Sequence, residues 1–463
     1  MRDFDPLLSE IRFGYGLSPV RAQPVSPDQM LDGLLAPDGM ATQFPIESFA
    51  QFRSRMAAAR EQREIRRKNR GTELAAAARK QRNVLNKEAR VAMVEWVGQT
   101  MLRRTHTETA FRERLVAFWA DHFTAQGKQG VVRRGTSPYV EEAIRPFIAG
   151  RFEDLLQSAV MHPLMLEYLD QTASIGPNSA RALKRGDQRR QGLNENLARE
   201  VLELHTLGVD GPYTQTDVTE FAELLTGVTY DVRNGFKFRK DFAEPGAETV
   251  LGVTYEDTTN VKPVRAALRD LAAHPATARH LAWKLAVHFV SDAPDPDLIN
   301  ALERAYVEND GQLMPVYAAL LSHPGAWDRT LVNYKPPIDF ISSAFRALAI
   351  PATAFAGWEE RPLRRVFIAP LARMGQPWEQ PNGPDGWAEE DPEWITPQQL
   401  AMRVAWSMAV PGQVLDPLPD PRQFADHALG RYANDAIRFA AGAAESRAEA
   451  IGVVLMSPAF QRR

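Results

Sequence analysis

Apolar residues along this chain recur mostly at intervals of three and four, the spacing that gathers them on one face of an α-helix, and strand-like alternation is scarce. The 33 prolines stand mainly between these periodic segments, where they separate one helix from the next. The pattern predicts a mainly α, multi-helical globular protein. One exception lies within Tyr230–Leu251, where polar and apolar residues alternate around Asn234-Gly235, a pair typical of two-residue hairpin turns. We expect a small β-hairpin there.

The chain divides into five expected regions. We predict an N-terminal helical segment over 1–50, a basic helical excursion over 51–95, a helical core with polar motifs over 96–350, a Pro/Trp-rich loop over 351–400, and C-terminal helices that pack on the core over 401–463. Three Trp of the loop fall in the Pro- and Gly-rich run Gly375–Pro397. They favour a lid across the helical core over a surface on which a ligand stacks.

Three leucine-rich helices are expected to end in His-Pro, at His162, His274 and His323. A histidine in the last turn of a helix favours the negative end of the helix dipole, and the proline that follows prevents the helix from continuing. The repeated stop signal predicts a shared local geometry with a structural role.

Composition narrows the function classes. With 463 residues, 44% hydrophobic and 24% charged, the chain can bury a sizeable core. A net charge of −3 argues against a dedicated nucleic-acid binder. The absence of cysteine excludes disulfides, thiolate metal sites and cysteine nucleophiles. Because the first residues lack the apolar run of a signal peptide and no stretch of about 18 apolar residues occurs, we expect no transmembrane segment and a cytoplasmic or periplasmic protein.

Charge is distributed unevenly. Residues 51–90 hold 13 Arg or Lys against four Glu, a local excess of nine positive charges, so the remainder of the chain is near −12. One interpretation is a solvated helical hairpin broken at Gly71. The other is a docking surface for an anionic partner: an acidic protein, a polymer or a lipid headgroup.

The densest group of polar side chains lies between Gly192 and Gly227. Asn194 is a suitable N-cap for a helix that runs to about Leu207, and Gly208 is a suitable stop. A projection at 100° per residue separates an apolar face, with Leu197, Val201, Leu204 and His205, from a polar face, with Glu195, Asn196, Arg199, Glu200 and Glu203. A second helix is predicted from Thr214, where Asp217 completes a capping box, to Gly227.

Two interpretations of the polar face stay open. Arg199 stands four residues from both Glu195 and Glu203, so the three can form a solvated ladder of ion pairs worth about 0.3–0.5 kcal/mol each. Alternatively, Glu200 and Glu203 line a cavity with Asn196, as ligands or acid/base groups. His205 projects onto the apolar face, which favours a hydrogen-bonded core residue. The acidic surface of the helix pair opposes phosphate contact and so excludes a DNA-binding helix-turn-helix.

A second candidate source of site residues is the predicted helix FRERLVAFWADHFT. Its apolar stripe contains Phe111, Leu115, Phe118, Trp119 and His122. His122 is either a core histidine or a site histidine packed between aromatic rings, whose pKa burial would lower. HExxH, GxSxG, Walker A and EF-hand motifs are absent.

Motifs in order across nearly the whole chain resemble the bacterial domain-of-unknown-function family numbered eighteen hundred. They are RFGYG, FWADHFT, YVEEAIRPFIAGRFEDLL, HPLMLEYLDQTASIGPNS, GLNENLARE, YTQTDVTEFAELLTG, AHPATARHLAWKLAVHFV, KPP and GQPW. The resemblance implies no established activity. It suggests a paired pathway or a complex, because members often accompany a family similar to sulfatases and alkaline phosphatases.

Two positions depart from the family pattern. Ala243 stands where relatives tend to carry the histidine of His-Glu-Pro-Gly, and Val228 stands where they tend to carry Trp. If that histidine has a catalytic or metal-binding role, this chain is altered in that role. Relatives also accept aromatic residues at the position of His205, which favours its place in the core.

The leading hypothesis is a helical protein with a central polar pocket and a hydrolytic or metal-assisted reaction on an unknown substrate. Glu200 or Glu203 would be base or ligand, His122 the acid/base group and Arg199 an anion clamp. Substrate contacts are expected from Asn194, Glu195, Asn196, Trp119, Asp170, Ser174 and Asn178. The cofactor is unknown, and a divalent metal is one candidate. The alternative is a non-enzymatic partner or scaffold for a sulfatase- or phosphatase-like protein.

Overall fold

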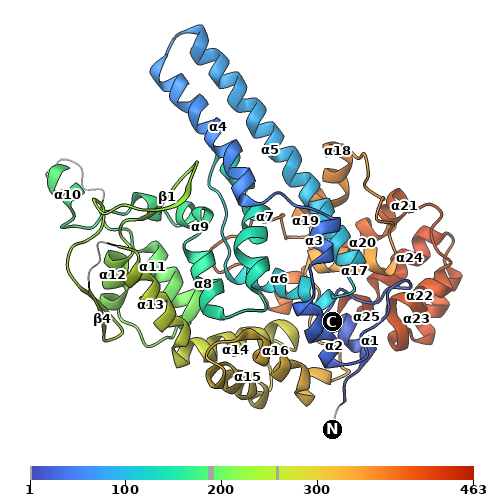
Figure 1. Ribbon diagram of the computed structural model, residues 1–463. Helices are drawn as coiled ribbons and strands as arrows, with labels where there is room; N and C mark the ends of the chain where they lie inside the picture. The colour runs from blue at the N-terminus through green and yellow to red at the C-terminus, as the bar shows by residue number, and fades with distance from the viewer. Residues whose placement is uncertain (1–2, 186–191, 257–259) are drawn as a thin grey trace.

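The computed structural model describes residues 3–185, 192–256 and 260–463. The mainly α prediction is confirmed, since within these ranges helices dominate and the only sheets are two antiparallel two-stranded ones. Helices α8–α13 and helices α20–α25 lie on opposite sides of the molecule, with α14–α16 beneath and a helical hairpin projecting above (Figure 1). No helix in the described ranges combines the length and hydrophobicity that a bilayer crossing requires.

The projecting hairpin consists of α4 (Phe49–Lys68) and α5 (Glu73–His106). Ser48 opens α4 with a capping box and Thr72 caps α5, and Gly71 between them has φ +82°, a conformation that favours glycine. The predicted break at Gly71 is therefore confirmed. Three short helices precede the hairpin: α1 (Pro6–Arg12), α2 (Pro27–Leu35) and α3 (Gly39–Gln43). The C-terminal half of α5 enters the body of the molecule, where its side chains are buried.

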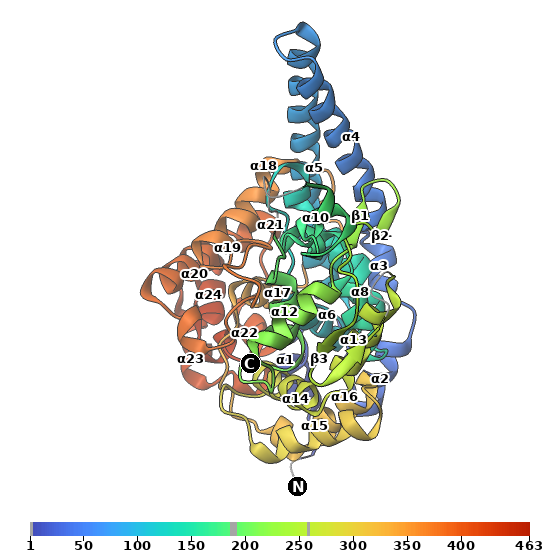
Figure 2. The same ribbon diagram turned by 90° about the vertical axis from the view of Figure 1, so that its left-hand side faces the viewer.

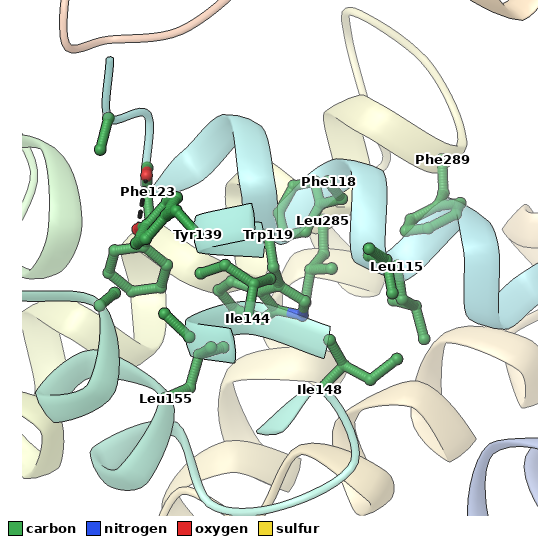
Figure 3. Close-up of a cluster of buried hydrophobic side chains, with 14 of the residues drawn as sticks. Leu115, Phe118, Trp119, Phe123, Tyr139, Ile144, Ile148, Leu155, Leu285 and Phe289 are labelled. Carbon is green, nitrogen blue, oxygen red and sulfur yellow. Dashed lines mark hydrogen bonds between the residues drawn. The ribbon is translucent and has the colours of Figure 1, made fainter. Parts of the chain in front are cut away.

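The middle of the chain forms the core around α6 (Ala110–His122). Leu115, Phe118 and Trp119 of α6 pack against Tyr139, Ile144 and Leu285 (Figure 3). The elements that follow α6 are η1 (Gly130–Arg134), α7 (Thr136–Tyr139), the π-helix η2 (Val140–Ile144), η3 (Arg145–Phe147), α8 (Phe152–Val160), α9 (Pro163–Tyr168), η4 (Gln171–Ala173), α10 (Ala180–Arg185), α11 (Asn196–Glu200), the π-helix η6 (Val201–Thr206) and α12 (Gln215–Leu224).

Two hairpins follow α12. The predicted one is present as β1 (Val228–Asp231) and β2 (Gly235–Phe238). Its turn differs from the expected two-residue type, because Gly235 already pairs with Asp231 and residues 232–234 connect the strands. A second hairpin joins β3 (Glu248–Val250) to β4 (Val253–Tyr255). Each of its strands has three residues, too few for an alternation to stand out in the sequence.

The remaining elements run from α13 to α25. They are α13 (Lys262–Ala273), α14 (Pro275–Phe289), α15 (Pro296–Glu308), α16 (Leu313–Ser322), η7 (Pro324–Trp327), α17 (Pro337–Ala347), α18 (Glu360–Leu363), the π-helix η8 (Arg364–Ile368), α19 (Ala369–Arg373), η9 (Asp391–Trp394), α20 (Pro397–Ala409), α21 (Pro411–Val414), α22 (Pro421–Leu429), η10 (Gly430–Tyr432), α23 (Asp435–Ala443), α24 (Arg447–Met456) and α25 (Pro458–Gln461). Region 351–400 therefore contains helical turns as well as loop. In Figure 2 the helices α19, α20, α23 and α24 lie on the left, and α14–α16 lie at the bottom.

The three His-Pro sites share one geometry, but its role differs from the expected one. The Nδ1 atoms of His162, His274 and His323 each accept a hydrogen bond of 3.1 Å from a backbone N–H two residues later. Each histidine thus caps the start of the next helix, where an acceptor and not a cation is needed. Burial lowers the pKa of His162 to about 3 and also lowers the pKa of His274, which keeps these two rings neutral. The expected interaction of a charged histidine with the preceding helix dipole is wrong for these two.

Candidate functional site

A pocket of about 190 Å³ lies between α5, α6, η2 and α17, and the segment 376–389 forms its remaining wall. We call it the central pocket. Its ionisable lining residues are Arg103, Arg104, Glu113, Arg114, Asp121, Glu141, Arg145, His288, Asp339, Glu379 and Glu389. Two Trp of the 376–389 segment, Trp378 and Trp387, also line it. The Pro/Trp-rich run thus closes one side of a pocket in the helical core, as a lid would.

Helix α6 presents different residues to the core and to the pocket. Leu115, Trp119 and His122 point into the core, where each is at most 2% exposed. Arg114 and Asp121, which are seven residues apart and hence on one helix face, line the pocket. The helix singled out by sequence therefore does contribute to a polar site, through Asp121 and not through the adjacent His122.

Asp121 is held by the opposite wall of the pocket. Its two carboxylate oxygens accept hydrogen bonds from the backbone N–H of Trp387, at 3.0 and 3.2 Å. The preceding Gly386 has φ +83°, and a Cβ there would lie 2.6 Å from Asp121 Oδ2, so only glycine fits. Burial raises the pKa of Asp121 to about 7, although the Lys284 charge opposes this shift.

Glu379 is a second pocket carboxyl with an unusual pKa. Its Oε1 accepts a hydrogen bond from the Ser137 hydroxyl of α7, and its backbone has φ +54°. Burial raises the pKa of Glu379 to about 7, against the opposing effect of the Ser137 hydrogen bonds. Asp121 and Glu379 therefore both titrate near neutral pH while lining one pocket.

Asp339 of α17, in contrast, is held ionised by arginines. Arg114 Nη1 and Arg463 Nη1 both donate to its Oδ2, the latter at 2.5 Å, and Arg104 Nη1 lies 3.6 Å from its Oδ1. Burial alone would raise the pKa of Asp339, but these guanidinium groups outweigh burial and hold the pKa well below its usual range.

His288 connects this cluster to the pocket wall. Its Nδ1 donates to Glu389 Oε1 at 2.7 Å, and its Nε2 accepts from Arg114 Nη2 at 2.8 Å. Since the arginine can only donate, the pair of contacts assigns the neutral Nδ1-protonated tautomer. Burial lowers the pKa of His288 to about 4, and Glu389 only partly opposes this shift. His288 therefore orients Arg114 and Glu389 and is not positioned to exchange protons.

The pocket arginines differ in how fully protein acceptors occupy them. Arg103 makes bonds of 2.6 and 3.1 Å to the Glu141 carboxylate, and Arg145 makes bonds of 3.0 and 2.6 Å to Glu113. The one hydrogen bond from Arg104 to a described residue, to Ser342 Oγ, is 3.5 Å long. Arg104 Nη1 also lies 3.6 Å from Asp339 Oδ1, so Arg104 is held least tightly of these arginines and has the most donor capacity left for a ligand.

The predicted polar helix face lies outside the central pocket. Arg199 donates to Glu203 at 3.2 Å and to Glu195 at 3.3 Å, which is the ion-pair ladder considered above. Gln215 and Thr219 of α12 each donate to Glu195 at 2.9 Å, so the face also joins two helices. Asn194 Oδ1 accepts from the Asn196 N–H at 2.9 Å, close to the expected capping role.

Glu200 on this face has a perturbed environment. Burial raises its pKa to about 7, and the charges of Glu203 and Asp385 add to the shift. Asp385 also raises the pKa of Asp121, so its charge acts on both the predicted helix face and the central pocket.

The other predicted substrate contacts are engaged within the protein. Lys128 Nζ lies 2.5 Å from Asp170 Oδ2, and Ser174 Oγ accepts from the Asn194 N–H at 3.1 Å. Asn178 donates to both carboxylate oxygens of Glu244, at 2.8 and 2.6 Å. Trp119 is fully buried and donates to the Tyr317 hydroxyl at 2.7 Å.

His122 and His205 lie side by side in the core. His122 Nε2 donates to the His205 carbonyl at 3.2 Å, and burial holds the pKa of His122 well below its usual value. His205 has no exposed surface, which agrees with the core interpretation. Neither of its ring nitrogens has a hydrogen-bond partner among the described residues, so the expected hydrogen bond is wrong.

The two departures from the family pattern are also buried. Ala243 is 5% exposed and Val228 is 2% exposed. A Cβ added to Gly227 would lie 3.3 Å from the Ala243 Cβ, so these segments touch. Within the described ranges, one acidic group has its carboxylates close enough for a cation, Glu220, Glu223 and Glu248, and it lies outside the pocket lining.

The comparisons with known proteins give a family and no activity. A family model described as a protein of unknown function, DUF1800, matches residues 10–462. The chain belongs to this family. No curated protein and no solved structure matches it. The DUF1800 motifs quoted above nevertheless converge in space, because FWADHFT supplies Asp121, LAVHFV supplies His288 and GQPW supplies Trp378 to the central pocket.

Sequence reasoning missed Asp121, Glu379, His288 and Glu389 as site residues. Three of them could have been found from the family motifs: Asp121 and His288 lie inside such motifs, and Glu379 directly follows GQPW. The sequence pattern instead favoured the helix after Asn194, because many polar residues are concentrated there. The polar residues of the pocket are spread over several distant segments of the chain.

Proposed function

We propose that this DUF1800 member is an enzyme that binds a small anionic substrate in the central pocket and transfers protons through Asp121 and Glu379. The observation that carries the proposal is that two carboxyl groups with pKa values near 7 line one pocket of about 190 Å³. A pocket of that size admits a small molecule or the reacting end of a larger one.

Two carboxyl groups of this kind suit general acid–base catalysis. At neutral pH each is populated in both protonation states, so one can accept a proton from water while the other donates to a leaving group. Hydrolysis is the plainest reaction for such a pair. His288 supports it as a positioning residue, because it holds Arg114 and Glu389 in place.

The arginine arrangement favours an anionic substrate. Arg103, Arg114 and Arg145 make close hydrogen bonds to carboxylates of the protein, whereas Arg104, which also lines the pocket, contacts Asp339 Oδ1 at 3.6 Å and Ser342 Oγ at 3.5 Å. A planar guanidinium with free N–H groups binds phosphate, sulfate or carboxylate in a bidentate manner.

The polar helix face remains a proposed part of the site. Glu200 or Glu203 would act as base or ligand and Arg199 as anion clamp. His122, the acid/base group expected from the sequence, is 2% exposed and bound to the His205 carbonyl, so it is not part of this face. The support for this face is the raised pKa of Glu200, to which the charge of Asp385, two residues before the pocket-lining Trp387, contributes. This face would hold the part of the substrate that leaves the pocket past residue 385.

The proposal is tested with 4-nitrophenyl phosphate, sulfate and acetate as probes and with inorganic phosphate and sulfate as ligands. Wild type should turn over at least one probe, and Asp121→Asn and Glu379→Gln should each lower kcat by about 10²- to 10⁴-fold. Arg104→Gln should chiefly raise KM. Asp435→Asn, at a fully exposed carboxylate, is the matched control and should behave as wild type. No turnover and no anion binding, or equal rates in all variants, would contradict the proposal.

A non-enzymatic scaffold is the second candidate function, with a sulfatase- or phosphatase-like protein as partner. It is favoured by the basic hairpin, whose distal part lies outside the pocket lining. Pull-down of such a protein with wild type and with a variant lacking residues 60–82 separates the two functions, because pocket chemistry should not need that segment.

A further inference from the structure

The distal part of the α4–α5 hairpin, residues 63–82, concentrates unpaired positive charge. We call it the hairpin tip. It contains two acidic residues, Glu64 and Glu73, and eight basic ones: Arg63, Arg66, Arg67, Lys68, Arg70, Arg79, Lys80 and Arg82. Among the described residues none of the eight basic side chains forms an ion pair. Seven of them are exposed and Arg82 is partly exposed.

The tip stands clear of the body of the molecule (Figures 1 and 2). Met56 is the last fully buried residue of α4, and the helix continues for 12 residues to Lys68. At 1.5 Å per residue this places the end of α4 about 18 Å farther out. Charges are screened over about 8–10 Å at physiological ionic strength, so the acidic body does not cancel the field of the tip.

The tip also exposes apolar surface at its end. Leu74, in the first turn of α5, is 55% exposed, and Ala76 and Ala77 are exposed beside it. Cations precede this apolar group at Arg70 and follow it at Arg79. Apolar residues ringed by Arg and Lys are the composition of segments that lie at the boundary between lipid headgroups and acyl chains.

We propose that the hairpin tip docks this protein on an anionic lipid bilayer, with Leu74 at the membrane interface and the surrounding Arg and Lys on lipid headgroups. An anionic bilayer fits the tip best, because cations lie on both helices. When the end of the hairpin rests on a flat lipid surface, cations of both helices can contact headgroups together. Nucleic acid would leave exposed Leu74 without a role. The chain outside residues 51–90, near −12, is repelled by the same surface, which orients the molecule tip first.

The test is co-sedimentation of the full chain with phosphatidylcholine vesicles and with vesicles that also contain phosphatidylglycerol, at about 0.1 M salt. Wild type should bind only the anionic vesicles. The triple variant Arg66→Glu, Arg67→Glu, Arg70→Glu should bind them on the order of 100-fold more weakly, since each lost cation should weaken binding about fivefold.

Two further variants define the mechanism. Arg265→Glu, Arg304→Glu and Arg373→Glu together make the same charge change on exposed arginines of the body and should leave vesicle binding intact. Leu74→Ser keeps the charge and should weaken vesicle binding while leaving any binding to duplex DNA unchanged. Circular dichroism confirms that each variant is folded.

Three outcomes overturn the proposal. They are failure of wild type to bind anionic vesicles, equal binding by the tip variant, and binding to DNA or RNA in preference to vesicles. Self-association that the tip variant abolishes, without vesicle binding, would instead assign the tip to a second copy of the chain. Capture of a protein partner without vesicle binding would assign it to the scaffold function.

Discussion

Asp121 and Asp339 face the same pocket, and their surroundings give them opposite charge states. Asp121 receives two hydrogen bonds from one backbone N–H and no guanidinium, so burial dominates and its pKa rises to about 7. Asp339 is in contact with Arg114 and Arg463, which outweigh burial and keep it ionised. At the scale of the residue, the partner decides whether a carboxylate in this pocket can exchange protons or serves as an anchor.

The raised pKa of Asp121 predicts a pH-dependent stability. A carboxyl whose folded pKa exceeds its unfolded value near 3.9 contributes fully below that value and loses its contribution as pH rises to about 7. Asp121→Asn removes this loss, so it should stabilise the protein relative to wild type by about 4 kcal/mol more at pH 8 than at pH 4. Urea unfolding of both proteins at the two pH values measures the difference. Asp435→Asn serves as control, and a difference that does not change with pH would refute the assignment.

At the scale of the element, local sequence rules explain most helix boundaries. Capping boxes at Ser48, Thr214 and Thr396 and prolines in the first turn open the helices, and Gly71 and Gly208 close them. The His-Pro sites show the limit of such rules, because a histidine between two helices can serve either one. The proline after each histidine marks the first position of the next helix. The histidine is therefore the N-cap of that helix, where the free backbone N–H groups need an acceptor.

His274 provides the element-scale test. His274→Ala should cost about 1 kcal/mol through loss of the N-cap of α14, whereas His274→Asn should retain most of it, because asparagine also accepts the bond. Burial lowers the pKa of His274, so its contribution is present above the unfolded pKa near 6.5 and is lost as pH falls below it. Thermal unfolding of both variants at pH 8 and pH 5 measures this. An Asn variant as unstable as the Ala variant at pH 8 would argue against capping.

At the scale of the whole molecule, the central pocket is a meeting point of distant segments. Arg104 of α5, Arg114 of α6, Asp339 of α17 and Arg463 form one cluster around a single carboxylate. His288 of α14 and Glu389 extend it across the pocket wall. The cluster therefore ties α5, α6, α14 and α17 to Glu389 and Arg463 as well as shaping the site.

Removal of the shared carboxylate should destabilise the entire fold. Asp339→Asn leaves three buried guanidinium groups without their anion and should cost about 3–5 kcal/mol of unfolding free energy. Asp435→Asn, an exposed carboxylate paired to one arginine at 3.5 Å, should cost less than about 1 kcal/mol. Denaturant titrations measure both, and equal losses would show that the cluster is not a structural centre.

The amino-acid sequence by itself determined the helical class, the basic hairpin and its break at Gly71, the first β-hairpin, the caps around Thr214 and the family. Each depends on neighbours within about four positions, or on motifs in fixed order. Only the tertiary structure decided that Asp121, and not His122, faces the pocket, since adjacent residues on a helix point about 100° apart and packing selects the inward one. The tertiary structure also brought residues as distant in sequence as Arg103 and Glu389 to one cavity. The sequence could not show this, because contacts between distant segments leave no periodic signal in the chain.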